Sequence, residues 1–222
     1  MQHIYIVRHG ETDVNVRDEV NDRRKITPIN DRGKKQAIKT GKYLNKLIKS
    51  DSTVIYSSSC TRAVQTAEII SNSFKKPKPI IQDKRITELD YGILSGSKPS
   101  DKIMKEYMKE YNKFAKDPID LQLRWTEFDN IIYKKFKSEQ LKPAKKRSLS
   151  FMKSLPKDTK NIIIVSHGGI LQIIIKVLFN IEPNIMGDLS NGNNCTITFI
   201  TREKNNYNLL TLPNTLHLAG MK

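Results

Sequence analysis

Three short apolar segments, each followed by a polar loop and then by a helical pattern, constrain the fold of this chain more than any other sequence feature. The segments cover residues 3–7, 53–56 and 161–165 and are rich in Ile, Val and Tyr. Runs of four or five such residues are typical of strands that are covered on both faces. Because helical patterns alternate with them, the sequence predicts an α/β fold with a mainly parallel central sheet.

Further elements fill the rest of the chain. Helices are predicted over residues 33–48, 63–74 and 170–179, a short strand over 79–82, and a closing pair of strands over 195–201 and 207–212. Apolar side chains recur at helical spacing in residues 33–48, which indicates an amphipathic helix with one buried face.

The middle of the chain is less regular. Residues 97–157 hold two predicted helices, at 101–115 and 127–136, and then a basic stretch at 142–147. No internal repeat and no sharp change of composition divides the sequence. We therefore expect a single domain over residues 1–222 with a variable insertion at about 97–157.

Charge and cysteine content narrow the class of protein. The 222 residues include 39 Lys and Arg against 23 Asp and Glu, a net charge of +16. This excess allows an anionic partner, but most of it is scattered lysine, which is typical of a solvated surface. Two cysteines, Cys60 and Cys195, are too few for a disulfide framework or a multi-cysteine metal site. No apolar run is long enough for a membrane span and no signal-peptide pattern is present, so a soluble cytoplasmic protein is expected.

Cationic side chains follow all three predicted strands. Arg8 and His9 follow the first strand, Arg62 the second and His167 the third. Ligands of open α/β sheets bind at the carboxyl ends of the strands, so these side chains are expected to converge. A phosphoryl group in transfer spreads charge over three oxygens, which guanidinium forks grip well. Each residue alone has an ordinary structural explanation, but their recurrence at three strand ends favours a phosphate site.

The same residues lie in a series of ordered motifs. They are Arg8-His9-Gly10-Glu11-Thr12 with Asn15, and the segments 28–37, 56–67, 88–96, 165–169 and 194–198. In this order and spacing they resemble the histidine phosphatase superfamily, in its phosphoglycerate mutase-like branch 1. The resemblance implies a three-layer α/β/α sandwich, phosphoglycerate mutase-like, with a mixed, mainly parallel sheet.

The resemblance also implies a covalent mechanism. His9 would take up the phosphoryl group as phosphohistidine, and Glu88 would act as general acid and then general base. The other residues implied at the phosphate and substrate site are Arg8, Asn15, Arg62, Tyr91, His167 and Gly168. The family's chemistry needs no metal or organic cofactor.

Other phosphate chemistries lack their sequence marks. No Cys is followed six positions later by Arg, and neither a P-loop nor a GxGxxG motif occurs. Mutases of the resembled family carry adjacent arginines after the proton-donor segment, where residues 97–125 offer only Arg124. Residues 126–129 also lack the Gly-Glu-Ser segment of small broad-specificity phosphatases. We therefore predict a phosphatase of phosphomonoesters, with phosphoglycerate mutase-type phosphotransfer as the alternative and a non-catalytic basic nucleic-acid-binding protein as a remote one.

A basic loop follows Asn15. Its residues Arg23 and Arg24 are expected near the pocket mouth, where they would select substrates with a second anionic group; a solvated basic loop is the equal alternative. The expected partner is therefore a phosphorylated small molecule, polyanionic if this loop contacts it. Neither a specific nucleic acid nor a membrane is expected, and the sequence leaves the oligomeric state open.

Overall fold

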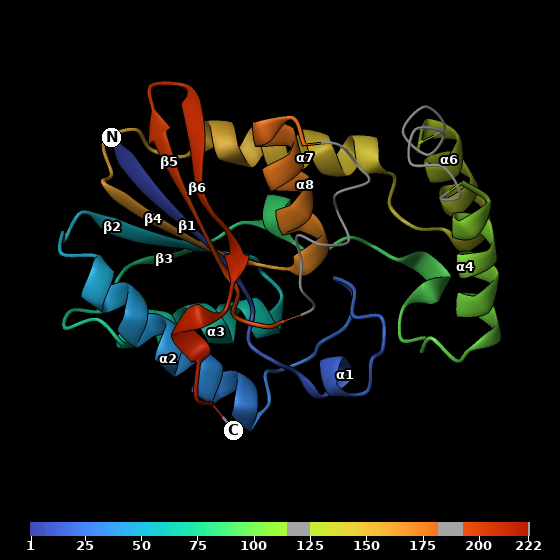
Figure 1. Cartoon of the computed structure of the whole chain (residues 1–222), viewed down its shortest axis with the longest axis horizontal. Helices are drawn as coiled ribbons and strands as arrows, with labels where there is room; N and C mark the ends of the chain where they lie inside the picture. Colours follow the sequence, from blue (N-terminus) through green and yellow to red (C-terminus); the bar gives the residue numbers. More distant parts are fainter. Residues whose placement is uncertain (115–124, 182–192, 222) are drawn as a thin grey trace.

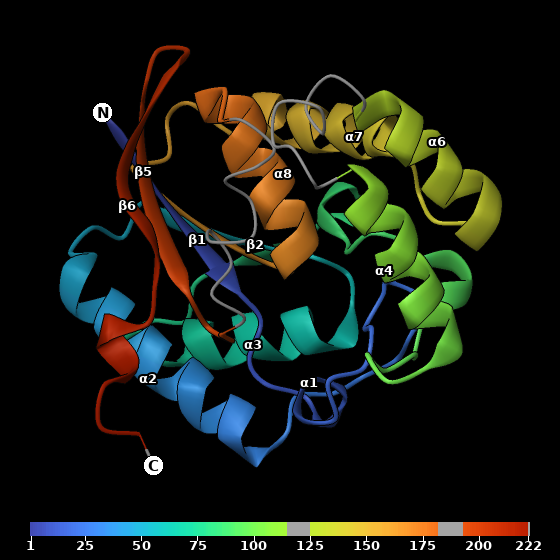
Figure 2. The ribbon, with the colours of Figure 1, turned by 45° about the vertical axis from the view of Figure 1, so that its right-hand side comes forward.

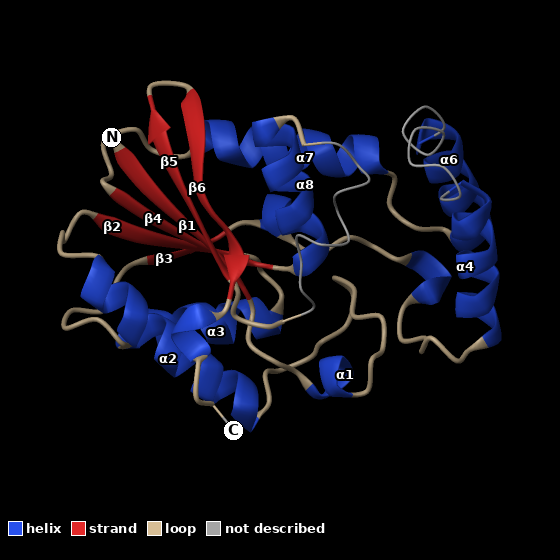
Figure 3. Cartoon of the chain, in the orientation of Figure 1, coloured by secondary structure: helices blue, strands red, loops and turns tan. Residues whose placement is uncertain are grey.

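The computed structural model describes residues 1–114, 125–181 and 193–221, and in these ranges six strands form one mixed sheet in the order β3-β2-β4-β1-β5-β6 (Figures 1 and 3). The strands are β1 (Gln2–Arg8), β2 (Thr53–Ser57), β3 (Ile80–Gln82), β4 (Asn161–Ser166), β5 (Ile197–Glu203) and β6 (Asn206–Asn214). The first four run parallel, whereas β5 and β6 form an antiparallel hairpin beside β1. The predicted mixed, mainly parallel sheet is confirmed.

Helices cover both faces of this sheet and make a three-layer α/β/α sandwich (Figure 2). Alternate side chains of β1 explain the two faces, because successive residues of a strand point in opposite directions. Ile4 and Ile6 pack in one cluster with α7 (Leu141–Ser154) and α8 (Gly168–Phe179). Tyr5 and Val7 pack in another cluster with α2 (Asp31–Leu47) and α3 (Thr61–Asn72).

Two helices stand away from the sheet. They are α4 (Lys102–Phe114) and α6 (Trp125–Phe136), at the right of Figure 1. Their own small core joins Phe114, Phe128 and Phe136 to Leu94. The short elements α1 (Asp13–Val16), η1 (Lys84–Ile86), η2 (Gly92–Leu94) and η4 (Leu216–Leu218) lie in the connections.

Helix α7 lies within the segment expected as an insertion, residues 97–157, yet it belongs to the sheet layers. Phe151 and Met152 of α7 are buried against β1, β2 and β4. The basic stretch 142–147 lies in the first half of this helix. The part that stands off the sheet therefore ends before Leu141.

The helices next to the strand ends begin earlier than their apolar patterns predict. Helix α3 begins at Thr61 instead of residue 63, and α8 begins at Gly168 instead of residue 170. Apolar periodicity starts only with the first buried residue, so it misses the polar first turn. As a result Arg62 and Gly168 belong to helical first turns. No helix of the described part is long and apolar enough to cross a membrane.

Phe151 provides a test of the core. Its side chain is fully buried, lies edge-on to Tyr56 and contacts the Arg85 guanidinium. We expect Phe151→Ala to lower the free energy of unfolding by about 3–5 kcal/mol, because it removes burial and leaves a cavity. Tyr133→Ala on α6, where the side chain is half exposed, should cost less than about 1 kcal/mol. Urea denaturation of both variants measures the difference, and equal losses would contradict this packing.

Candidate active site

The carboxyl ends of β1, β2 and β4 meet at one edge of the sheet and bring the predicted phosphate-handling residues together. The strand register pairs Arg8 of β1 with Ser166 of β4, and Ser57 of β2 with Val165 of β4. The loops that follow these three strands therefore start at the same level. The rings of His9 and His167 lie with centroids 5.2 Å apart. His9, Arg62 and His167 are all buried, which takes two imidazoles and a guanidinium out of water.

His9 is held as a neutral ring with one free nitrogen. Its Nδ1 lies 2.8 Å from the carbonyl oxygen of Gly10, which can only accept, so Nδ1 carries the proton. The lone pair is then on Nε2. Burial, followed by the nearby Arg62 and Arg8 guanidiniums, lowers the pKa of His9 well below its usual value. An unprotonated Nε2 is the form of imidazole that can attack phosphorus.

The loop that carries His9 crosses the start of α2 at very close range. The amide of Gly10 donates to Thr66 Oγ1 at 3.0 Å. A Cβ atom on Gly33 would lie 2.2 Å from the carbonyl oxygen of Glu11, so this crossing requires a glycine. The loop is therefore held on two sides, by the close approach to Gly33 of α2 and by the hydrogen bond to Thr66 of α3.

Residues 21–27, part of the basic loop that follows Asn15, hold the guanidinium of Arg62 in place. Its Nη1 donates to Thr27 Oγ1 at 3.0 Å, and its Nη2 donates to the carbonyl oxygens of Asp22 and Asn21 at 3.1 and 3.3 Å. Its Nε keeps no hydrogen-bond partner within the described part of the molecule. The guanidinium is therefore fixed in direction and still has a donor to offer.

Three buried nitrogens at this edge have no partner among the described residues. They are Arg8 Nε, Arg62 Nε and His167 Nδ1. At the opposite side of its ring, His167 Nε2 lies 2.7 Å from Ser58 Oγ. Leaving a buried donor unsatisfied costs about 1–3 kcal/mol, so such groups normally meet a ligand, water or another side chain. Oxygens of a bound phosphoryl group would satisfy them.

Asn15 offers a neutral donor on the cavity wall. Its Oδ1 already accepts from Thr12 Oγ1 at 2.9 Å and from Asn194 Nδ2 at 3.2 Å. These contacts orient the amide so that its NH₂ group is the available end. Asn15 lines the same cavity as Arg8 and His9.

Glu88 is a buried carboxyl at the N-terminus of α8. Its Oε1 accepts from the amides of Leu89 and Ile170 at 2.9 and 3.2 Å, and its Oε2 accepts from Gly169 at 3.2 Å. Burial raises the pKa of Glu88, and these amides and the two arginines only partly oppose the shift. A carboxyl with a raised pKa can donate a proton near neutral pH.

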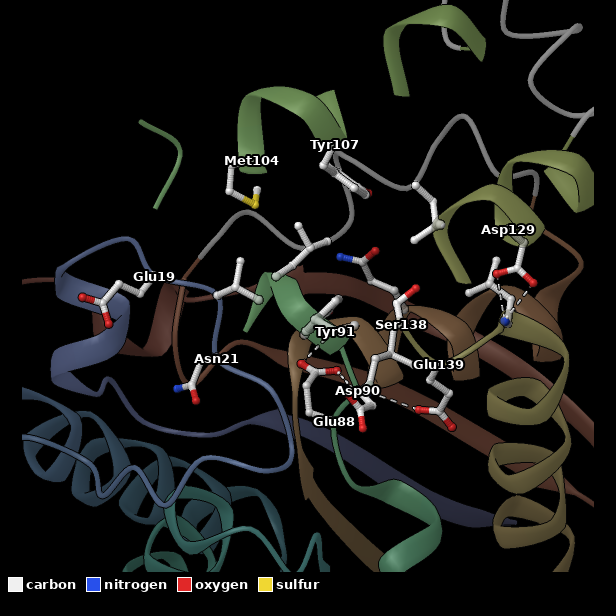
Figure 4. Close-up of a pocket in the computed structure, with 18 of the residues that line it drawn as sticks. Glu19, Asn21, Glu88, Asp90, Tyr91, Met104, Tyr107, Asp129, Ser138 and Glu139 are labelled. Carbon is white, nitrogen blue, oxygen red and sulfur yellow. Dashed lines mark hydrogen bonds between the residues drawn. The ribbon is translucent and has the colours of Figure 1, made fainter. Parts of the chain in front are cut away.

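Gly169 allows Glu88 and Tyr91 to approach the helix. A Cβ atom at this position would lie 2.6 Å from Glu88 Oε1 and 2.7 Å from Tyr91 Oη. Figure 4 shows Glu88 and Tyr91 close together in the pocket. Gly168, the preceding residue, lines the cavity next to Arg8.

Of the residues expected at the site, Arg8, His9, Asn15, Glu88, Tyr91 and Gly168 line a cavity of about 560 Å³, whereas the buried Arg62 and His167 are not among its lining residues. Beyond the phosphate-handling residues its wall is apolar and aromatic, formed by Leu94, Met104, Tyr107, Trp125, Phe128 and Ile132. Five carboxylates also line it: Asp18, and the four labelled in Figure 4, Glu19, Asp90, Asp129 and Glu139. The cavity therefore lies between the sheet edge and the two outlying helices.

Arg23 and Arg24 do not line this cavity. Arg23 forms ion pairs with Glu139 at 3.2 Å and with Asp90 at 3.7 Å, and Arg24 pairs with Asp22 at 2.8 Å and with Asp90 at 3.2 Å. Both line a separate shallow hollow with Lys25, Cys60 and Lys84. The structure thus brings together the other residues expected at the site but not these two. Arg124 lies outside the described residues.

Arg147 and Glu139 are part of the site's support, and the sequence interpretation missed both. Arg147 lies on α7 and donates to the carbonyl oxygen of Glu88 at 3.3 Å. It also forms a two-pronged ion pair with Glu139, at 2.9 and 3.0 Å. One signal was available: Arg147 is the only arginine in a stretch whose other cations are lysines, and arginine suits forked contacts.

No group of three or more His, Cys, Asp or Glu side chains within the described ranges is arranged to hold a metal ion.

The chain matches a family model and known proteins over most of its length. The model of the histidine phosphatase superfamily (branch 1) matches residues 4–215. A 2,3-bisphosphoglycerate-dependent phosphoglycerate mutase of Buchnera aphidicola subsp. Cinara cedri is 30% identical over 210 residues, covering 84% of this chain and 87% of that protein.

Solved structures share the fold. Bacillus stearothermophilus YhfR superposes with a TM-score of 0.79 at 22% identity, covering 98% of this chain and all of that one. Phosphoserine phosphatase from Entamoeba histolytica, in complex with 3-phosphoglyceric acid, gives a TM-score of 0.71 at 22% identity with the same coverage. The family match over residues 4–215, on a fold that joins His9, Arg62 and His167 at one sheet edge, places this chain in the histidine phosphatase superfamily, branch 1.

Proposed function

We propose that this protein is a metal-independent phosphatase that hydrolyses phosphomonoesters through a phosphohistidine on His9. The observation that carries the proposal is the set of unpartnered buried nitrogens of Arg8, Arg62 and His167 around a neutral imidazole. Arg8 Nε and Arg62 Nε are donors, and His167 Nδ1 is a third when Ser58 Oγ, which accepts from the amide of Cys60, donates to Nε2. Three donors suit the three equatorial oxygens of a phosphoryl group in transfer. The proposed substrate is a phosphorylated small molecule.

The reaction proceeds in two displacements. His9 Nε2 attacks phosphorus, the N–P bond forms, and the P–O bond to the leaving group breaks while Glu88 gives that oxygen its proton. Glu88, now a carboxylate, takes a proton from a water molecule, whose oxygen attacks the phosphohistidine. The N–P bond then breaks, which releases inorganic phosphate and returns neutral His9 and protonated Glu88. Arg8, Arg62, His167 and the amide of Asn15 hold the oxygens throughout.

Mutase activity is the second candidate, and the similarity over most of the chain to a curated phosphoglycerate mutase favours it. The lining of the cavity supports the phosphatase instead. A phosphoglycerate mutase has to bind the carboxylate of its substrate, yet Arg8 is the sole Lys or Arg among the described lining residues.

Cys60 and Cys195 are free thiols, which supports the proposal that the protein works in the reducing cytoplasm.

Turnover in the presence of a chelator tests this function. We expect the protein to release phosphate from p-nitrophenyl phosphate in EDTA, and His9→Ala to lower kcat/KM by at least about 10³-fold, because the nucleophile is lost. His3→Ala, in the same strand but away from the site, is the control and should retain activity. Assayed with 3-phosphoglycerate and a trace of its bisphosphate, the protein should release phosphate. Efficient isomerisation without hydrolysis would identify a mutase.

The pH dependence of kcat/KM tests the assignment of Glu88. The active form needs His9 neutral and Glu88 protonated. The pKa of His9 is lowered, so activity should persist as the pH falls below the usual range of histidine. The pKa of Glu88 is raised, so activity should fall as the pH rises through that raised value.

Glu88→Gln should remove the alkaline fall and lower kcat/KM by about 10²–10⁴-fold for alkyl phosphates, whose leaving groups need a proton. At each pH, kcat/KM of the wild type is divided by kcat/KM of Glu88→Gln for the same substrate. The ratio removes the effect of the substrate's own ionisation on the profile. An alkaline fall that persists in Glu88→Gln would exclude this residue as the acid.

A further inference from the structure

The outer part of the cavity has an aromatic wall. Tyr107 and Trp125 lie with their ring centroids 6.3 and 5.6 Å from that of Phe128, and Tyr107 meets Phe136 edge-on. The wall belongs to the small core between α4 and α6, so it is built by packed rings rather than by single exposed side chains. A volume of about 560 Å³ is far larger than a phosphate ion needs and falls in the usual range for organic ligands.

The charged side chains that line this outer part are carboxylates, and nearby arginines form ion pairs with several of them. Arg147 and Arg23 pair with Glu139, Arg23 and Arg24 pair with Asp90, and Arg17 pairs with Glu19. These four arginines are thus engaged by carboxylates of the protein itself. Within the described residues, they therefore add no unpaired positive charge to the cavity wall.

Asp129 is a lining carboxylate that forms no ion pair within the described parts of the chain. Both of its oxygens accept from the amide of Leu141, at 3.0 and 3.2 Å, and partial burial raises its pKa. Figure 4 shows Asp129 on the opposite side of the pocket from Glu19, with Glu88 and Tyr91 between them. A second anionic group on the substrate would have to approach this carboxylate while losing its own water.

Given the proposed function, we infer that the leaving group of the substrate is an apolar, ring-bearing alcohol or phenol that carries no second anionic group. Arg8 is the single Lys or Arg in the described lining and is committed to the transferred phosphoryl group. The remaining wall offers rings, aliphatic side chains and carboxylates, which suit a neutral ring. Selection of polyanions by Arg23 and Arg24, expected from the sequence, is therefore not favoured.

A matched pair of substrates tests this inference. 4-(Methoxycarbonyl)phenyl phosphate and 4-carboxyphenyl phosphate have nearly the same size and differ by one negative charge. We expect kcat/KM to be at least about tenfold higher for the neutral ester, because the carboxylate meets Asp129 and an apolar wall. Asp129→Asn keeps an acceptor for Leu141 and should narrow the ratio. Asp158→Asn is the control of equal charge change: this exposed residue precedes β4, at the opposite edge of the sheet, and the ratio should not change.

The outcomes separate this inference from the proposed function. Turnover of both substrates at equal kcat/KM, or faster turnover of the carboxylate, would overturn the inference and leave the phosphatase standing. An unchanged ratio in Asp129→Asn would overturn the electrostatic discrimination. No phosphate release from either ester would instead refute the proposed function.

A second, independent observation concerns the backbone that carries Glu88. Arg147 Nη1 donates to the carbonyl oxygens of Arg85 and Thr87, both at 2.7 Å, and Nη2 donates to that of Glu88. Glu139, oriented by Arg147, also accepts from the amide of Asp90 at 3.3 Å. The guanidinium of Arg147 therefore links three carbonyl groups of the segment 85–90, which carries Glu88, to α7.

On the proposed mechanism, the geometry points to Arg147 as a positioning residue for the proton donor. Its side chain touches the backbone of the segment rather than the reacting atoms. Without the Arg147 guanidinium, the carbonyl oxygens of Arg85, Thr87 and Glu88 would lose this donor. The segment that carries Glu88 would then be free to shift. A shift on the order of 1 Å in a catalytic group can cost about 10²-fold in rate.

The leaving group of the substrate separates this role from a purely structural one. Arg147→Lys keeps the charge but cannot reach three carbonyls and Glu139 together. We expect it to lower kcat/KM by about 10–10²-fold for an alkyl phosphate, which needs the proton, and by less than about threefold for p-nitrophenyl phosphate, which does not. Lys146→Gln, an exposed neighbour on α7, should change neither rate.

Glu88→Gln calibrates the experiment, since it should show the same split between the two substrates. Equal losses on both substrates in Arg147→Lys, with a lowered melting temperature, would reduce Arg147 to a structural residue. A split in Glu88→Gln but none in Arg147→Lys would also refute the positioning role. The absence of a split in Glu88→Gln would instead refute Glu88 as the proton donor.

Discussion

The buried guanidinium of Arg62 and the buried imidazoles of His9 and His167, with the half-buried Arg8 beside them, are the constraint on which the rest of this structure depends. Burying a guanidinium is costly unless oxygens surround it. Arg62 meets this demand with Thr27 and the carbonyls of residues 21 and 22, which folds the basic loop beneath it. Burial, and then the same positive charges, lower the pKa of His9 and keep it unprotonated, so a single arrangement provides both the phosphate-binding groups and the nucleophile.

Glu88 has to be placed against this cationic cluster without being ionised by it. Burial favours the protonated form, and the amides of α8 and the arginines favour the charged one; the net effect raises the pKa. Such a balance is sensitive to position. The segment that carries Glu88 is accordingly fixed on two sides, by the first turn of α8 through the side chain and by Arg147 of α7 through the backbone.

The cavity illustrates how little a net charge says about a binding site. The surplus of +16 fitted either an anionic partner or a solvated surface, and the loop with Arg23 and Arg24 offered one means of selecting polyanions. In the folded chain these arginines bind Asp90, Glu139 and Asp22, so they neutralise the rim instead of extending the phosphate site. The aromatic wall from α4 and α6 then sets the character of the pocket.

The sequence by itself determined the strands, the helices that follow them and the identity of the groups at the strand ends. Those features are local: apolar runs mark covered strands, and the residue after a parallel strand must lie at the carboxyl edge of the sheet. His9, Arg62 and His167 could therefore be assigned before any coordinates. Only the tertiary structure decided which charges pair, because Arg23 and Glu139 lie 116 residues apart and meet only when α7 packs on the sheet. Arg147 could not be singled out within a basic run for the same reason: besides Glu139, its partners are carbonyl oxygens, which every residue has and no sequence pattern distinguishes.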